Sequence, residues 1–485
     1  MTHKVLLYLL AAVCGAGSLC GQVVLNPTPS RALGQTRLQI TAIQPNLVDA
    51  KGLFTPQAVA LDTSVSPSVL YVADTGNNRV LGWRNATSAG NGAPADFVVG
   101  QRDEFSAFPQ GPRGSGDPRG TLSTGLAGPT GVAVDRNGNL YVADAGNNRI
   151  LRYPRPYERT PDSRLPDMVI GQERFTEGLP NRGQSTCSAS TLAFSPTSLS
   201  FPAAVCGGCS ISGITFDSAG NLWVPDPLNH RVIRFPVSLL GPTAGSLPAA
   251  DLVLGQGDFT SRSSLGLTAQ NRLVRTGMTD PSVVAVDGAG RVYVADAFAR
   301  VLVFTGPLPP TGASAARILG IATGTPPTDT IFRGPVNGLF FVGNSLAAVD
   351  TVAHRILRFD PFDQWPLENV TFSPAARAVA GQADFVSGQA NRGLREPTEA
   401  TFNTPVGAVS TDAAVYIADA FNNRVLVLPI NSGVIAPATR LFGQEGFGFN
   451  AANAVEGREI SVNIGTVTAS GATVTATGTG IAIDR

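Results

Sequence analysis

Residues 128–153 decide the fold. They read Gly128-Pro-Thr-Gly-Val-Ala-Val-Asp135, then Arg-Asn-Gly-Asn, then Leu140-Tyr-Val-Ala-Asp144, then Ala-Gly-Asn-Asn and Arg149-Ile-Leu-Arg-Tyr153. Three short apolar runs are separated by two tight turns rich in Gly and Asn, which is typical of antiparallel strands joined by hairpins. The stretch therefore predicts three neighbouring strands of one antiparallel sheet.

The same unit recurs six times, with 54 to 82 residues between equivalent aspartates. A repeat of this length that holds several short strands is typical of a propeller with one blade in each period. Each copy keeps an aspartate at the end of the second strand and an arginine where the third strand begins. The aspartates are Asp74, Asp144, Asp226, Asp296, Asp350 and Asp419, and the arginines are Arg79, Arg149, Arg231, Arg300, Arg355 and Arg424.

A fourth apolar run follows in each copy and ends in Gly-Gln. Its copies are residues 97–101, 168–172, 252–256, 378–382 and 441–444, with a worn copy at 318–320 that ends in Gly. Each repeat is therefore expected to form a four-stranded antiparallel meander. Because neither face of these strands is consistently polar, the sheets are expected to stack radially into a closed ring, which leaves no long exposed edge.

Three motifs recur over residues 55–444: Pro-x-Gly-Val-Ala-Val-Asp, Leu-Tyr-Val-Ala-Asp and Asn-x-Arg-(Ile/Val)-Leu. Together they resemble the repeat of the NHL family. The resemblance implies an all-β fold, a six-bladed β-propeller of four-stranded antiparallel blades over residues 31–450. Two copies depart from the pattern. In repeat four the turn at residues 298–300 is one residue short, and repeat five lacks the aspartate of the first strand.

The two ends of the repeat array leave a seventh blade as the alternative. Residues 31–35 carry another Gly-Gln ending, so they are a candidate for the outer strand of the last blade. Residues 451–485 are rich in Thr, Val and Gly and alternate as β-strands do. This C-terminal β segment is expected to close the ring, to form part of a seventh blade or to be a separate appendage.

Residues 1–20 have the pattern of a secretory signal peptide. Lys4 precedes a short apolar run at residues 5–13, and the small residues Ala16 and Ser18 fit a cleavage site. The run is too short to span a bilayer, and no other stretch of the sequence is long and apolar enough to do so. We therefore expect a secreted or periplasmic protein without a transmembrane segment.

Three cysteines remain after cleavage, namely Cys187, Cys206 and Cys209. In an oxidising compartment they favour a disulfide between Cys187 and either Cys206 or Cys209, which would staple one insertion. A zinc site is the less favoured interpretation, because the Cys-Gly-Gly-Cys stretch has no partner motif to complete four ligands.

The composition and the scarce histidines argue against several functions. Charged residues make up 14% of the chain and the formal net charge is zero, whereas nucleic-acid binding requires a basic face. Propeller lyases that resemble this repeat family use a histidine-bound zinc. Outside the signal segment this chain has only His230 and His354, at equivalent turn positions, which cannot supply three histidine ligands.

The repeated aspartates allow a ring of carboxylates, but turn N–H groups and the following arginine explain them as structural residues. The first-strand aspartates Asp62, Asp135, Asp217 and Asp287 fit Asx turns equally well. A calcium ion on the propeller axis stays open, although no set of ligands is singled out. We therefore assign no catalytic, cofactor-binding or metal-ligating residues.

Long insertions connect each fourth strand to the next first strand, and topology places them on the face that carries the second turn of each repeat. We interpret their recurring Phe, and the Asn-Arg-Gly words at residues 181–183 and 391–393, as pins that hold each insertion to its own blade. The unrepeated parts, such as residues 109–119, are the candidate contacts, because loops on a rigid scaffold carry most binding sites.

The sequence therefore favours a secreted, monomeric, non-catalytic propeller that binds a protein, peptide or glycan through the face of the long insertions. One alternative is a lactonase-like or lyase-like enzyme with a calcium or zinc ion on the axis. Another is a structural surface module.

Overall fold

A computed structural model describes residues 47–109, 125–196, 210–241, 247–309, 311–320 and 327–453. Several of the expectations above lie outside the described residues: the signal peptide at 1–20, the Gly-Gln copy at 31–35, the candidate contacts at 110–119, Cys206, Cys209 and the C-terminal segment from 454 to 485.

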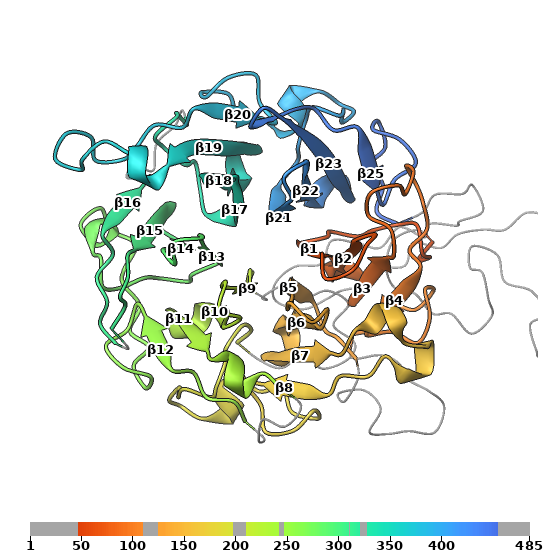
Figure 1. Cartoon of the computed structure of the whole chain (residues 1–485), viewed down its shortest axis with the longest axis horizontal. Helices are drawn as coiled ribbons and strands as arrows, with labels where there is room; N and C mark the ends of the chain where they lie inside the picture. Colours follow the sequence, from red (N-terminus) through yellow and green to blue (C-terminus); the bar gives the residue numbers. More distant parts are fainter. Residues whose placement is uncertain are drawn as a thin grey trace, which may run out of the picture.

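The described chain forms six antiparallel sheets that radiate from a central axis (Figure 1). Five sheets have four strands and the last has five, so the structure has six blades rather than seven. In each blade the strands follow chain order from the axis outward. The strands are β1 (Ala58–Asp62), β2 (Val69–Asp74), β3 (Arg79–Trp83) and β4 (Phe97–Val99) in blade 1; β5 (Pro129–Val134), β6 (Leu140–Asp144), β7 (Arg149–Tyr153) and β8 (Met168–Ile170) in blade 2; β9 (Thr215–Phe216), β10 (Leu222–Asp226), β11 (Arg231–Phe235) and β12 (Leu252–Leu254) in blade 3; β13 (Val283–Val286), β14 (Val292–Asp296), β15 (Arg300–Phe304) and β16 (Arg317–Leu319) in blade 4; β17 (Val336–Val342), β18 (Ser345–Asp350), β19 (Arg355–Pro361) and β20 (Ala378–Ala380) in blade 5; and β21 (Pro405–Ser410), β22 (Ala414–Asp419), β23 (Arg424–Asn431), β24 (Val434–Ile435) and β25 (Arg440–Phe442) in blade 6.

The turn between the first and second strands is set by its aspartate. In blade 2, Oδ1 of Asp135 accepts the N–H of Asn137 at 2.8 Å and of Asn139 at 3.0 Å, which is an Asx turn. Gly138 completes the turn with a φ of 80°, in the left-handed region that glycine enters without strain. This turn and its copies in the other blades form one face of the ring, which we call the hairpin face.

A short 3-10 turn joins the second strand to the third in five blades, and the residue after it has a left-handed backbone with φ between 50° and 53°. These turns are η1 (Thr75–Asn77), η2 (Ala145–Asn147), η6 (Pro227–Asn229), η9 (Thr351–Ala353) and η12 (Ala420–Asn422). Further 3-10 turns lie in the described connections: η3 (Pro156–Glu158), η4 (Pro161–Ser163), η5 (Pro180–Gly183), η7 (Val237–Leu239), η8 (Asn271–Leu273), η10 (Phe362–Gln364) and η11 (Ala390–Gly393).

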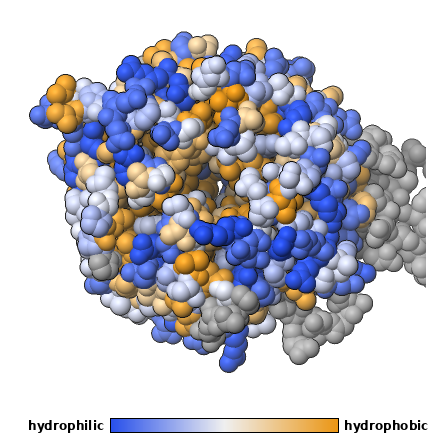
Figure 2. Space-filling model, viewed as in Figure 1, coloured by the Kyte–Doolittle hydropathy of each residue, from blue (hydrophilic) through white to orange (hydrophobic). Residues whose placement is uncertain are grey.

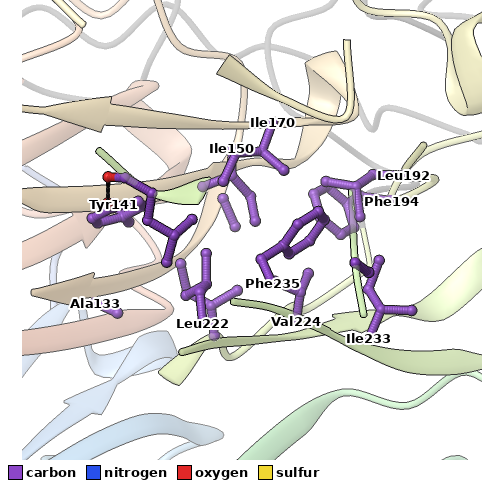
Figure 3. Close-up of a cluster of buried hydrophobic side chains, with 14 of the residues drawn as sticks. Ala133, Tyr141, Ile150, Ile170, Leu192, Phe194, Leu222, Val224, Ile233 and Phe235 are labelled. Carbon is purple, nitrogen blue, oxygen red and sulfur yellow. Dashed lines mark hydrogen bonds between the residues drawn. The ribbon is translucent and has the colours of Figure 1, made fainter. Parts of the chain in front are cut away.

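The hydrophobic core lies between the blades, because each sheet packs both of its faces against its neighbours. Figure 3 shows the boundary of blades 2 and 3, where Tyr141 and Ile150 face Leu222, Val224 and Phe235. All five side chains have 0% exposure. Burying a large apolar side chain contributes about 1.5–3 kcal/mol, so each boundary is a substantial part of the fold's stability.

Blade 6 takes its outer strand from its own repeat. β25 pairs with β23, with Leu441 opposite Leu426. The place beside β23 that the sequence suggested for residues 31–35 is therefore filled by β25. Blades 6 and 1 instead meet directly, because the N–H of Gly407 donates to the carbonyl of Gln57 at 2.9 Å.

Candidate functional site

The repeated aspartate and arginine of each blade form a buried ion pair. In five blades the arginine Nε lies 2.7–2.9 Å from the aspartate Oδ2, and in blade 4 Nη2 of Arg300 lies 2.9 Å from Oδ2 of Asp296. All twelve side chains have 0% exposure, so none of them presents a surface to a ligand. The pairs are Asp74–Arg79, Asp144–Arg149, Asp226–Arg231, Asp296–Arg300, Asp350–Arg355 and Asp419–Arg424.

Five of these arginines also tie two insertions to their blade, and Arg300 is the exception. Nη1 of Arg424 donates to the carbonyl of Phe447 at 2.7 Å, in the insertion that follows blade 6. Nη2 donates to the carbonyls of Thr398 at 2.8 Å and Thr401 at 2.9 Å, in the insertion that precedes it. A guanidinium offers five donors in a fixed plane, which is why arginine suits this position. The recurring Phe of the insertions therefore contributes its backbone carbonyl, and it binds its own blade.

The glutamine of the Gly-Gln word closes each insertion into a compact loop. Its Nε2 donates to the carbonyl of the residue seven positions later at 2.6–3.0 Å, and to the carbonyl of the left-handed residue before the repeat arginine at 2.8–3.1 Å. The sequence showed the repetition of this glutamine but not its partner. The residues are Gln101, Gln172, Gln256, Gln382 and Gln444.

The Asn-Arg-Gly words bind the next blade, which corrects the interpretation that they pin each insertion to its own blade. Asn181 follows blade 2, and its side-chain amide exchanges hydrogen bonds of 2.8 and 2.9 Å with that of Asn229 in blade 3. Asn391 pairs in the same way with Asn422 of blade 6. An insertion therefore joins two blades: the arginine holds it to one, and the asparagine holds it to the next.

In five blades the left-handed residue before the repeat arginine makes a second bond between blades. In blade 5, Nδ1 of His354 accepts the N–H of Thr404 in blade 6 at 2.8 Å. Burial lowers the pKa of His354, and Arg333 lowers it further, which keeps the acceptor nitrogen unprotonated at neutral pH. Nδ1 of His230 accepts the N–H of Asp280 at 3.3 Å. The two histidines thus replace the asparagines that make this bond elsewhere, namely Asn78, Asn148 and Asn423.

This bond is missing between blades 4 and 5. Ala299 occupies the left-handed position with a φ of 55° and has no acceptor. In blade 5 the residue at the donor position is Gly334, because the N–H of Arg333 donates to Asp350 as that of Asn403 donates to Asp419 in blade 6. Only the acceptor is therefore missing at this boundary. The shorter turn also changes the repeat arginine, because both Nη atoms of Arg300 donate to the preceding insertion, at Arg272, Val274 and Gly277.

A channel with a volume of about 220 Å³ lies on the axis between the innermost strands, and Figure 2 shows its opening. The innermost strands of neighbouring blades lie close together around this channel, and the glycine of the Pro-x-Gly-Val-Ala motif makes that possible. A Cβ at Gly131 would lie 1.9 Å from the carbonyl oxygen of Ser212, and one at Gly407 would lie 2.6 Å from that of Gln57. Any side chain at these positions would push neighbouring blades apart.

The described channel lining is mainly apolar and contains no Asp, Glu or His. Its polar side chains include Gln57, Thr130 and Asn337. Calcium sites are built largely from carboxylates and zinc sites from His, Cys or carboxylates, so this donor set fits neither ion. Within the described ranges, no group of three or more His, Cys, Asp or Glu has the arrangement of a metal site.

Cys187 lies in the insertion between blades 2 and 3, where its thiol is buried and donates to the carbonyl of Ser261 at 3.3 Å. Burial raises the pKa of this thiol. Its proposed partners Cys206 and Cys209 lie outside the described residues, so the disulfide stays a prediction.

The comparisons with known proteins fit this geometry. Residues 126–153 match the NHL repeat family. The curated proteins contain no match. Among solved structures, a streptogramin B lyase is similar, with 9% identity, coverage of 81% of this chain and 84% of that chain, and a TM-score of 0.39. The match falls on blade 2 and the other five sheets follow the same repeated pattern, so the structure is a six-bladed β-propeller that carries an NHL repeat.

Proposed function

We propose that this protein is an exported, non-catalytic propeller that binds a protein, peptide or glycan. The binding surface is the face that carries the second turns and the long insertions, which we call the insertion face. The observation that carries the proposal is a set of exposed apolar side chains held on this face by buried polar contacts.

Exposed large apolar side chains are concentrated on the insertion face. Of the thirteen that occur among the described residues, eight lie in its insertions or second turns. A single exposed apolar side chain is normal on any protein, but their concentration on one face makes that face the candidate surface for a partner. The eight are Leu179, Leu267, Leu273, Val352, Val386, Leu394, Phe421 and Phe449, with exposures between 42% and 65%.

The loops that carry these side chains are ordered before any ligand arrives. Phe449, for example, lies between Phe447, whose carbonyl accepts from Arg424, and Ala451, whose carbonyl accepts from Gln444. A loop that is already fixed loses little conformational entropy on binding, which favours affinity. The anchoring contacts of the insertions thus support a binding role for the exposed residues between them.

The enzyme alternative has less support. It requires acidic or amide side chains from several blades on the axis, and the described channel walls are mostly Val, Ala, Leu and Gly. The export part of the proposal rests on the sequence of residues 1–20. Within the described part of the chain, no helix is long and apolar enough to cross a bilayer.

The test compares two faces of the same molecule on peptide and glycan arrays. One variant carries Phe421→Ser and Phe449→Ser on the insertion face, whose side chains are 58% and 60% exposed. The control carries Leu367→Ser and Val370→Ser on the hairpin face, 72% and 75% exposed. We expect the first variant to lose array binding at least tenfold and the control to keep it. Equal binding by all three proteins would refute the proposal.

A further inference from the structure

The insertions that follow blades 2 and 5 form equivalent pockets on the insertion face, and the two pockets have opposite net charge. Residues 171–183 and 381–393 align without a gap, because both begin with Gly-Gln and end with Asn-Arg-Gly. The pocket at blade 2 has a volume of about 630 Å³ and the pocket at blade 5 a volume of about 460 Å³. Each pocket is therefore a natural reference for the other.

The arginine of the blade 2 pocket is neutralised by its own insertion. Nη1 of Arg182 lies 2.7 Å from Oε1 of Glu173, and Glu177 adds a second carboxylate to the walls. Oε2 of Glu177 accepts the N–H groups of Glu173 at 3.1 Å and of Arg174 at 3.3 Å. Two acids thus face one cation, so this pocket has no excess of positive charge.

The blade 5 pocket lacks both of these acids. Ala383 stands at the position of Glu173, and Ser387 stands at the position of Glu177. The arginine is kept as Arg392, which lines the pocket without the glutamate that pairs with its counterpart.

A second arginine enters the blade 5 pocket from the preceding insertion. Arg333 takes the position of Ala127 in blade 2, because the N–H of each donates to the aspartate that ends the second strand of its blade. Its side chain lines the same pocket as Arg392. The walls therefore contain two cations and no carboxylate.

Both arginines are exposed, and their own loops use only some of their donors. Nη1 of Arg333 donates to the carbonyl of Gly388 at 2.8 Å. Nε and Nη2 of Arg392 donate to the carbonyls of Gly381 at 3.2 Å and Gln382 at 3.1 Å. Among the described residues, no partner binds Nε and Nη2 of Arg333 or Nη1 of Arg392, and neither arginine is part of an ion pair. The pocket thus holds two oriented guanidinium groups with donors left for an anion.

The neighbouring carboxylate, Asp384, is occupied by its own turn. Its Oδ1 accepts the N–H groups of Val386 at 3.0 Å and Ser387 at 2.7 Å. Hydrogen bonds from Ser387 and Val386 lower the pKa of Asp384, and the charge of the buried Arg355 lowers it further. Asp384 does not belong to the pocket lining, so it does not replace the missing glutamates.

Aliphatic side chains beside the two arginines indicate the rest of the ligand. Val386 lines the pocket and is 53% exposed. Val352 is 42% exposed and lies next to Gly334, the residue after Arg333. A guanidinium fork matches the geometry of a carboxylate, and the two valines offer apolar surface that a purely polar ligand would leave in water. A peptide combines both features when an acidic residue lies near an aliphatic one.

We propose that the insertion face binds an acidic peptide segment at this pocket. An Asp or Glu carboxylate of the peptide pairs with Arg333 and Arg392, and a neighbouring aliphatic side chain packs on Val352 and Val386. This inference rests on the proposed function and names the class of ligand for that face.

The experiment applies the native protein to an array of paired decapeptides. Each acidic peptide has a partner with Asn and Gln in place of Asp and Glu, and polygalacturonate and heparin fragments on the same surface are acidic glycan probes. We expect a subset of acidic peptides to bind about tenfold more strongly than their amide partners, since one hydrogen bond to a charged group changes an affinity by roughly this factor.

The outcomes separate this inference from the proposed function. Equal binding within the peptide pairs would overturn the acidic assignment and leave the proposed binding face intact. Binding to the acidic glycans alone would overturn the peptide assignment. The absence of binding to any peptide or glycan would refute both proposals.

Matched variants locate the contact. Arg333→Gln combined with Arg392→Gln removes both charges and should abolish the preference for acidic peptides, whereas Arg182→Gln in the blade 2 pocket should keep it. Ala383→Glu leaves both arginines in place and restores the carboxylate of the blade 2 pocket, so it should also weaken acidic peptides about tenfold. An undiminished preference in Ala383→Glu, or in a double variant that melts like the native protein, would overturn the inference.

Discussion

Different kinds of contact hold two neighbouring boundaries of the ring, the one between blades 5 and 6 and the one between blades 4 and 5. Between blades 5 and 6, the bond from Thr404 to His354 and the pair of Asn391 with Asn422 cross the boundary. Between blades 4 and 5, Ala299 provides no such acceptor.

Aromatic packing and rim contacts hold the second junction instead. The ring of Trp365 meets that of Tyr293 edge-on at 6.5 Å, and Tyr293 also meets Phe341 at 5.4 Å. At the rim, Nη1 of Arg291 lies 2.6 Å from Oδ1 of Asp363. The repeat motif thus supplies hydrogen bonds between blades. Where the motif is degenerate, as at Ala299, aromatic side chains fill the boundary instead.

The largest expected effect comes from breaking the apolar junction. Trp365 is 8% exposed, and Trp365→Ala should lower the free energy of unfolding by about 3–5 kcal/mol, because a cavity replaces its contacts with blade 4. Asn391→Ala, at the polar junction, should cost about 1–3 kcal/mol, since it leaves Asn422 buried without its partner. Urea unfolding followed by circular dichroism measures both. A larger loss in Asn391→Ala than in Trp365→Ala would reverse the comparison.

Acidification should weaken the polar junction and spare the apolar one. The folded-state pKa of His354 is below its unfolded value, so its contribution is present above the unfolded pKa and is lost as the pH falls through the folded pKa. Protonation at Nδ1 removes the acceptor for Thr404, a bond of about 1 kcal/mol. His354→Asn keeps an acceptor that does not titrate.

The measurement is the melting temperature of the native protein and of His354→Asn at pH 7.5 and at pH 5.0. We expect similar values at pH 7.5 and a smaller decrease on acidification in His354→Asn. Identical decreases in the two proteins would mean that the bond between His354 and Thr404 does not contribute to the pH dependence.

The smallest effect comes from restoring the missing bond between blades 4 and 5. Ala299→Asn should stabilise the protein by about 0.5–1 kcal/mol, since asparagine tolerates the left-handed backbone better than alanine. The N–H of Gly334 is the donor that the new side chain would accept. Ala299→Gly also suits the left-handed backbone but adds no acceptor, so it is the matched control. Urea unfolding should show Ala299→Asn to be more stable than Ala299→Gly by about 1 kcal/mol. Equal stability of the two variants would show that no bond forms.

The repeats made most of the fold predictable. Strand order, blade number and the turn role of residues such as Asp135 follow from patterns within one repeat, where the interacting groups are two to five residues apart. The partner of Asn181 was not predictable in the same way, because Asn229 lies 48 residues later in another blade. The error of assigning that asparagine to its own blade came from treating each repeat as a closed unit.

Asn453 closes the ring with the same contact that the chain uses internally. Its N–H donates to the carbonyl of Leu53 at 2.8 Å, and its side chain accepts from Asn77 of blade 1 at 2.7 Å, as Asn181 and Asn229 pair between blades 2 and 3. The described ends at residues 47 and 453 therefore belong to one ordinary boundary. A circularly permuted chain, joined there and opened in another insertion, would keep every contact of this kind, so the ring has no preferred starting blade.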